Sequence, residues 1–138
     1  YCILDKAHDG QDKRMGVYRG MYLTGDESFT SREWVEQNIH GTGPLGALYP
    51  STTWTAPNRH SCVKEDDTPS WFFFLPMGGN DPNDPSKPGW GGQFEKGRGG
   101  WYFDPPATET YDPRTGVSRW RPAFEEDFAL RMGWSRDE

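Results

Sequence analysis

The sequence has no long apolar run and no cluster of basic residues. A transmembrane helix needs about 18 or more consecutive apolar residues, and no run reaches that length. The chain carries 15 Lys and Arg against 21 Asp and Glu, and its cations are scattered, whereas nucleic-acid binding requires clustered ones. We therefore expect neither a membrane nor a nucleic-acid partner.

Signatures of several catalytic classes are also missing. There is no Ser-His-Asp order, no GxSxG motif and no CxxC pair, and the glycine-rich segment 97–100 lacks the strand and helix that flank a phosphate loop. His40 and His60 are single loop histidines, a setting in which histidine is more often structural. The two cysteines, Cys2 and Cys62, could bond to each other, or one could bond to another chain.

Aromatic residues, glycine and proline are abundant instead. Aromatics make up 15% of the 138 residues, against a low hydrophobic fraction of 33%, and there are 17 glycines and 12 prolines. A disordered chain would not carry so many aromatics, so we expect a folded, loop-rich protein with one domain over residues 1–138. Because the chain begins at Tyr1 without a signal peptide, we expect a mature or proteolysed product, or a fragment.

Two helices can be predicted from their end signals. Thr30 or Ser31 is the expected N-cap of the first, Glu33 completes a capping box with Thr30, and Gly41 ends the helix. The last helix opens at Pro122 and stops at Gly133. Phe124, Phe128 and Met132 recur every four residues and are expected to form its buried stripe. Asp127 and Arg131 are expected to form an ion pair on its surface.

One short apolar run, Trp71–Leu75, lies between Pro69 and Pro76. Its length and aromatic content predict a strand buried on both faces, as in a parallel sheet. The fold class we expect is α/β, with part of an open, mainly parallel sheet, flanking helices and long aromatic and glycine-rich loops. Residues 41–64 are expected to be mostly loop, and residues 78–115 contain one further possible strand at 100–103.

Three segments around this run could carry chemistry. Glu65-Asp66-Asp67 is either an acid/base or metal cluster or a solvated turn. The segment 80–85 (NDPNDP) offers hard oxygen ligands for Ca²⁺, or forms a pair of Asx turns locked by proline. Trp90, set among three glycines, either stacks on a sugar ring or folds back as a lid over the aromatic run.

These motifs together resemble the nucleoside-hydrolase-like domain of secreted microbial proteins often labelled cellulose-binding. The resemblance is carried by GPLGALYP (43–50), EDDTPSWFFFL (65–75), GGNDPNDPSKPGWGGQFE (78–95) and RWRPAFEEDFALRMGW (119–134). It covers the chain from about residue 30 onward, while the first 30 residues match poorly. It implies that the chain is the C-terminal portion of such a domain and that the protein is secreted.

The resemblance also implies a site. Asp81 would be a Ca²⁺ ligand, Asn80 stands where true nucleoside hydrolases have histidine, and Glu65 or Asp67 would assist as acid or stabiliser. Trp90, Glu95 and Trp101 would contact a carbohydrate or nucleoside-like ligand.

The implied function is a glycoside or N-glycoside hydrolase acting through an oxocarbenium-like transition state. A separate chain would supply the N-terminal half-domain, and Cys2 or Cys62 could link the two chains. The alternative is a non-catalytic carbohydrate-binding module, and a third possibility is a structural or interaction protein.

Overall fold

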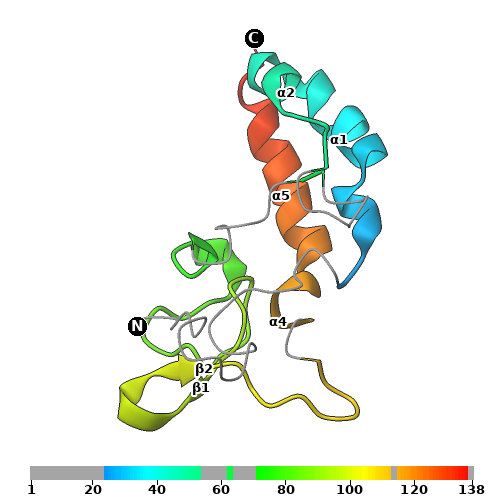
Figure 1. The fold of residues 1–138 in the computed structure, drawn as a ribbon. Coiled ribbons are helices and arrows are strands. Elements are labelled where there is room, and N and C mark those ends of the chain that lie inside the picture. Colours follow the sequence, from blue (N-terminus) through cyan, green and yellow to red (C-terminus); the bar gives the residue numbers. More distant parts are fainter. Residues whose placement is uncertain (1–23, 54–61, 64–70, 113–114, 137–138) are drawn as a thin grey trace. The chain divides into compact units, whose positions relative to one another are not determined.

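The computed structural model describes residues 24–53, 62–63, 71–112 and 115–136 (Figure 1). The chain forms two compact units. The helical unit comprises residues 22–65 and 118–138, and the loop unit includes residues 66–117. Within the described part of the chain, none of the helices combines the length and apolar character needed to cross a bilayer.

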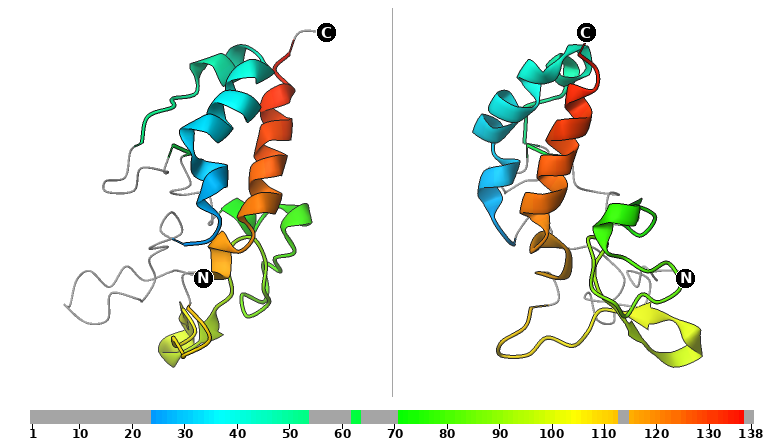
Figure 2. Two further views of the ribbon diagram at one scale, coloured as in Figure 1. Left: turned by 90° about the vertical axis from the view of Figure 1, so that its right-hand side faces the viewer. Right: turned by 180° about the vertical axis from the view of Figure 1, so that it is seen from behind.

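The helical unit is built on two main helices, α1 (Arg32–Asn38) and α5 (Arg121–Gly133). They lie side by side in both views of Figure 2, with α1 in blue to cyan and α5 in orange to red. Its shorter elements, among the described residues, are the 3-10 turns η3 (Glu27–Thr30) and η4 (His40–Thr42) and the helix α2 (Pro44–Leu48). Helix α4 (Thr115–Ser118) precedes α5 in the chain, and its first three residues belong to the loop unit. The core consists of Val35, Ile39, Cys62 and Val63, with half-buried Trp34, Tyr49, Phe128, Ala129 and Met132 against it.

Cys62 belongs to this core rather than to the surface. It is 1% exposed, and its Sγ lies 3.4 Å from the Ser51 carbonyl oxygen. A bond from Cys62 to another chain would therefore require the core to open. Cys2 lies outside the described residues.

Helix α1 begins where the sequence predicted, with Ser31 as the N-cap. The Ser31 Oγ accepts a hydrogen bond from the Trp34 backbone N–H at 3.1 Å, which satisfies one of the unpaired donors at the helix start. The capping box between Thr30 and Glu33 was wrong, because Thr30 is buried in η3 and donates its hydroxyl to the Glu27 carbonyl.

Helix α2 was not predicted, since its sequence PLGAL looks like loop. Pro44 stands at its first position, where a missing N–H costs nothing. Gly46 is needed because a Cβ there would collide with the Ile39 carbonyl oxygen. A glycine that usually breaks helices thus permits α2 to pack closely on the end of α1.

Helix α5 confirms the prediction for the C-terminal segment. Phe124 is buried, and Phe128 and Met132 are half-buried against the core, as the four-residue spacing indicated. Arg131 Nε and Asp127 Oδ2 form the predicted ion pair at 2.6 Å.

The loop unit contains two short antiparallel strands, β1 (Glu95–Lys96) and β2 (Tyr102–Phe103), joined through the turn η6 (Arg98–Gly100). Glu95 pairs with Phe103, and Lys96 with Tyr102. The expected strand at 100–103 is therefore confirmed for its last two residues. The described residues are mixed α/β, but they contain this antiparallel pair and no parallel sheet, so the open parallel sheet is not confirmed.

The predicted strand Trp71–Leu75 was wrong. Trp71 and Phe72 are helical, and hydrogen bonds from Phe74 N to Trp71 O and from Leu75 N to Phe72 O, at 2.9 and 3.3 Å, continue as tight turns. The chain then enters η5 (Pro76–Gly78). The apolar run therefore turns sharply instead of extending, and this exposes part of it.

Candidate functional site

Most of the residues assigned from the sequence lie in the loop unit, in residues 71–101. Glu65 and Asp67 lie outside the described residues. The rest fall into three structures: an aromatic turn, a polar loop and the β1–β2 hairpin.

The aromatic turn is anchored from inside by two ring contacts. Phe72 packs edge-on against Trp90 with ring centroids 5.6 Å apart, and Phe73 packs against Phe94 at 5.9 Å. All four rings are buried, with Trp90 9% exposed. The Trp90 backbone N–H also donates to the Gly78 carbonyl at 2.9 Å. Trp90 therefore lies over the aromatic turn, the arrangement expected of a lid, and its role in sugar stacking stays a prediction.

The outer side of the same turn presents the other two rings to solvent. Trp71 is 70% exposed and Phe74 71% exposed, and their ring centroids are 6.5 Å apart at an interplanar angle of 71°. We call this pair the Trp71–Phe74 surface. Sequence reasoning missed it because a strand buried on both faces hides every ring. The available signal was the three-residue spacing, which in a helical turn places both rings on one side.

Asn80 braces the glycine-rich loop that follows. Its Oδ1 accepts a hydrogen bond from the Gly91 backbone N–H at 2.7 Å. Gly89 packs so closely that a Cβ there would lie 2.5 Å from Asn80 Cγ. Asn80 Nδ2 is buried and has no hydrogen-bond partner among the described residues. The geometry gives Asn80 a positioning role within the loop, and its assignment to a catalytic site stays a prediction.

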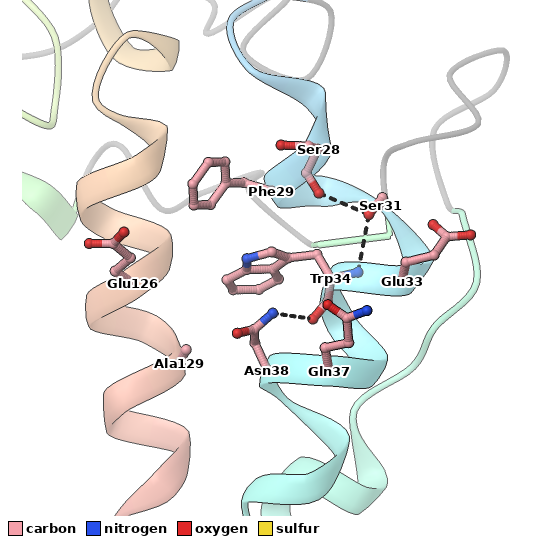
Figure 3. A pocket seen from close by; sticks show the side chains of 9 residues that line it. All are labelled: Ser28, Phe29, Ser31, Glu33, Trp34, Gln37, Asn38, Glu126 and Ala129. Atoms are coloured by element: carbon pink, nitrogen blue, oxygen red, sulfur yellow. Dashed lines mark hydrogen bonds between the residues drawn. The ribbon is translucent and has the colours of Figure 1, made fainter.

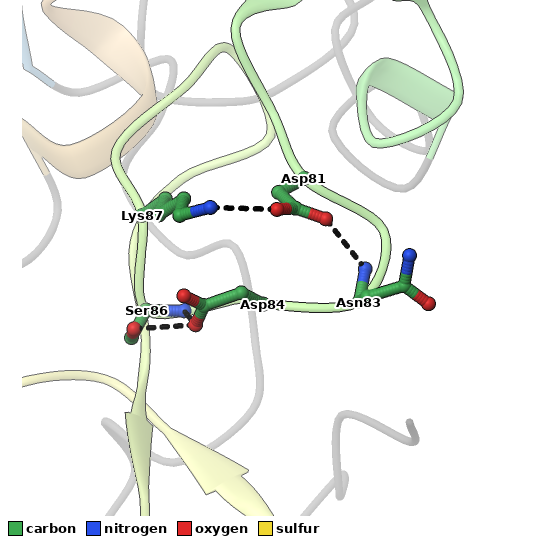
Figure 4. Close-up of polar contacts among 5 residues, drawn as sticks. All are labelled: Asp81, Asn83, Asp84, Ser86 and Lys87. Carbon is green, nitrogen blue, oxygen red and sulfur yellow. Dashed lines mark hydrogen bonds and ion pairs between the residues drawn. The ribbon is translucent and has the colours of Figure 1, made fainter.

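The polar loop 81–87 is closed by its own carboxylates (Figure 4). Asp81 Oδ1 accepts from the Asn83 N–H at 3.0 Å, and its Oδ2 pairs with Lys87 Nζ at 2.7 Å. Asp84 Oδ1 accepts from both the N–H and the hydroxyl of Ser86. The Lys87 and Asn83 hydrogen bonds lower the pKa of Asp81, and those from Ser86 lower the pKa of Asp84. Both are thus ionised Asx-turn residues at neutral pH.

This geometry bears on the predicted calcium site. Both oxygens of Asp81 already have partners within the loop. Among the residues that the structure describes, no three His, Cys, Asp or Glu side chains gather closely enough to hold a metal ion. The described residues therefore do not by themselves fit Ca²⁺, which takes six to eight oxygen ligands.

Glu95 and Trp101 belong to the hairpin. Glu95 is exposed on β1, and the half-buried Trp101 directly precedes β2, with its carbonyl accepting from the Gly97 N–H at 2.7 Å. The loop and the start of the hairpin are tied together by the Phe94 N–H, which donates to the Pro85 carbonyl at 2.9 Å. The contact of Glu95 and Trp101 with a substrate stays a prediction.

The described residues thus form a mixed α/β protein in which the aromatic turn, anchored by the buried contacts of Phe72 and Phe73, carries the exposed rings of Trp71 and Phe74. The family described as cellulose-binding Sde182, nucleoside hydrolase-like domain, has a model that matches residues 5–94, and the chain belongs to this family. Searches against curated proteins and against solved structures gave no significant match.

The family match confirms the resemblance but changes its extent. The matched region begins at residue 5, so the expectation that the first 30 residues match poorly was wrong. It ends at residue 94, which leaves the segment 119–134 outside it. That the chain represents the C-terminal portion of such a domain stays a prediction.

Proposed function

We propose that this chain is a polysaccharide-binding module and that it binds a cellulose-like glucan through the Trp71–Phe74 surface. The observation that carries the proposal is the exposure of two adjacent large rings, at 70% and 71%, on a turn whose other rings are buried. The family description, which includes cellulose binding, gives the ligand class.

Exposed rings suit this ligand for a physical reason. A β-linked glucan carries its hydroxyl groups around the edge of each sugar and presents apolar C–H faces, which an aromatic ring can cover. Large exposed apolar groups that lie together typically mark an interaction site. The buried contacts of Phe72 with Trp90, and of Phe73 with Phe94, fix the turn from behind. The backbone that carries the two exposed rings is therefore held in place before binding, which lowers the entropy cost of association.

Binding fits the described residues better than catalysis does. Hydrolysis requires a positioned pair of acidic groups, whereas Asp81 and Asp84 are both used to close their own loop. A calcium-dependent hydrolase, and a second chain that completes it, therefore stay predictions from the sequence. A polysaccharide ligand also supports the proposal that the protein acts outside the cell.

The test is retention on microcrystalline cellulose. If one ring face of Trp71 is covered, about 70 Å² leaves water, and at ~25 cal/mol/Å² this contributes about 1.8 kcal/mol, or about twentyfold in Kd. Trp71→Ala with Phe74→Ala should therefore weaken the apparent affinity for cellulose about twentyfold or more. Trp134→Ala is the control, because Trp134 is similarly exposed, at 67%, but belongs to the helical unit and is distant from Trp71 and Phe74 in the sequence. Retention of the double variant equal to that of wild type would overturn the proposal.

A further inference from the structure

The helical unit contains a second candidate site, an open cleft of about 660 Å³ between the η3–α1 segment and α5 (Figure 3). This volume lies within the range of about 300–1,000 Å³ that is typical of small-molecule sites. None of the site residues predicted from the sequence lines it. We call it the α1–α5 cleft.

Its apolar part is an aromatic pair that faces α5. Figure 3 shows Phe29 and Trp34 pointing from η3 and α1 toward α5, where Ala129 and Glu126 lie opposite. The centroids of the Phe29 and Trp34 rings are 6.1 Å apart at an angle of 46°. Trp34 also packs against the core, which holds its indole in place while leaving it half-buried.

The polar part offers both donors and acceptors. Asn38 Nδ2 donates to the Trp34 carbonyl at 2.9 Å, which fixes the amide and leaves Oδ1 as an acceptor without a partner among the described residues. The side chains of Gln37 and Glu126 are exposed and form no hydrogen bond within the described part of the chain. A bound molecule could therefore use an amide donor, an amide acceptor and a carboxylate.

The charge of the lining selects among ligand classes. Among the described residues, the lining includes the carboxylates of Glu33 and Glu126, and no Lys, Arg or His. This disfavours phosphorylated and acidic sugars, which would meet like charge without a counter-charge. An organic cation could stack on Trp34 and pair with Glu126, but it would leave the Gln37 amide donors unused. Hydroxyl groups both donate and accept, so a neutral sugar matches all of these groups.

We propose that the α1–α5 cleft binds a short neutral oligosaccharide, with Trp34 stacking on a sugar face and Gln37, Asn38 and Glu126 bonding its hydroxyls. The ligand class rests on the proposed polysaccharide-binding function, whereas the site is a different one, on the other unit of the chain. A cleft with hydrogen-bonding walls suits a soluble oligosaccharide or a chain end, while an open pair of rings suits a crystalline surface.

The experiment is a calorimetric titration of the whole chain with cellotetraose, alongside a glucosamine oligomer and an oligogalacturonate as cationic and anionic probes. Gln37→Ala combined with Glu126→Ala removes two exposed side chains and should leave the fold intact. The loss of their hydrogen bonds should weaken cellotetraose binding about tenfold or more. The matched control is Glu36→Ala, an exposed residue of α1 that does not line the cleft.

The outcomes separate this proposal from the function proposed above. Cellotetraose binding that the Gln37→Ala, Glu126→Ala variant loses, and that the Trp71→Ala, Phe74→Ala variant keeps, supports the cleft whether or not cellulose retains the protein. Absence of cellotetraose binding, or equal binding by the cleft variant and wild type, overturns the cleft even if cellulose retains the protein. Tighter binding of either charged probe than of cellotetraose overturns the neutral ligand class.

Discussion

Replacing Trp90 with alanine distinguishes the two roles that the sequence allowed for this residue. The ring is 9% exposed and packs edge-on against Phe72, so its removal opens a cavity in the loop unit. Truncating a buried Trp or Phe typically costs about 3–5 kcal/mol, which includes the aromatic pair contribution of about 0.5–1.5 kcal/mol. For a chain of this size, each kcal/mol lowers the Tm by roughly 3 °C, so Trp90→Ala should lower it by about 10 °C or more.

The assay is urea and thermal unfolding of wild type, Trp90→Ala and Trp90→Phe, together with cellulose retention at a temperature where all three are folded. Trp90→Phe keeps a ring against Phe72 and should recover more than half of the lost stability. Retention of the folded variants should follow wild type, because Trp71 and Phe74 are unchanged. A Trp90→Ala protein with wild-type stability and no retention would refute this reasoning and identify Trp90 as the sugar-stacking ring.

Three further predictions concern the polar loop and its glycine-rich continuation. Gly89→Ala should destabilise the loop unit by about 1–3 kcal/mol in urea unfolding, because its Cβ would collide with Asn80, whereas Gly133→Ala has nothing within 4 Å to meet and should be neutral. The pKa of Asp81 is depressed in the folded state, so its small contribution to stability is present above pH 4 or so and is lost as the pH falls through the folded pKa. Carboxyl NMR titration of Asp81 should give a pKa below the usual 3.8, and Lys87→Met should raise this pKa. The same Asp81 pKa in wild type and in Lys87→Met would show that the ion pair does not form in solution. EDTA should leave cellulose retention unchanged, and a loss that Ca²⁺ restores would support the calcium hypothesis instead.

The C-terminal helix could be predicted because its local and tertiary signals agree. Pro122 fits a first turn, and the positions of Phe124, Phe128 and Met132 repeat every four residues, so one helix satisfies both backbone and core. Local signals also narrowed the N-cap of α1 to two adjacent residues, Thr30 and Ser31. The structure decides for Ser31 because Thr30 is buried, and its carbonyl accepts a hydrogen bond from the backbone of Cys62, a residue distant in the sequence.

The aromatic turn could not be predicted, because a short apolar run carries no period of its own. Trp71–Leu75 satisfies the length and composition of a buried strand, and the same residues satisfy one helical turn followed by a reverse turn. The structure selects the turn because Phe72 and Phe73 find partners in Trp90 and Phe94, about 20 residues later in the chain. That partnership depends on the glycine-rich loop folding back, which no local signal encodes.

The hydrogen-bonding chemistry of the loop 80–87 could be predicted from the sequence, but the exposed Trp71–Phe74 surface could not. The segment 80–87 forms the hydrogen bonds of the Asx turns that Asn, Asp and Pro favour. Lys87 was overlooked, although a lysine six residues after Asp81 can close such a loop by pairing with it. Composition suggested a tryptophan as a candidate stacking residue, yet it could not distinguish the buried Trp90 from the exposed Trp71, since exposure is a property of the fold.

The two proposed sugar sites differ in how they relate to the region that matches the family. Trp71 and Phe74 both lie inside the matched region, residues 5–94. The α1–α5 cleft has one wall inside that region, at residues 28–38, and the other on α5 outside it. A chain of this family without an equivalent of α5 would lack the carboxylate of Glu126 and the support of Ala129. In this chain, the proposed recognition of soluble oligosaccharides should therefore depend on α5, whereas the proposed binding of crystalline polysaccharide through Trp71 and Phe74 should not.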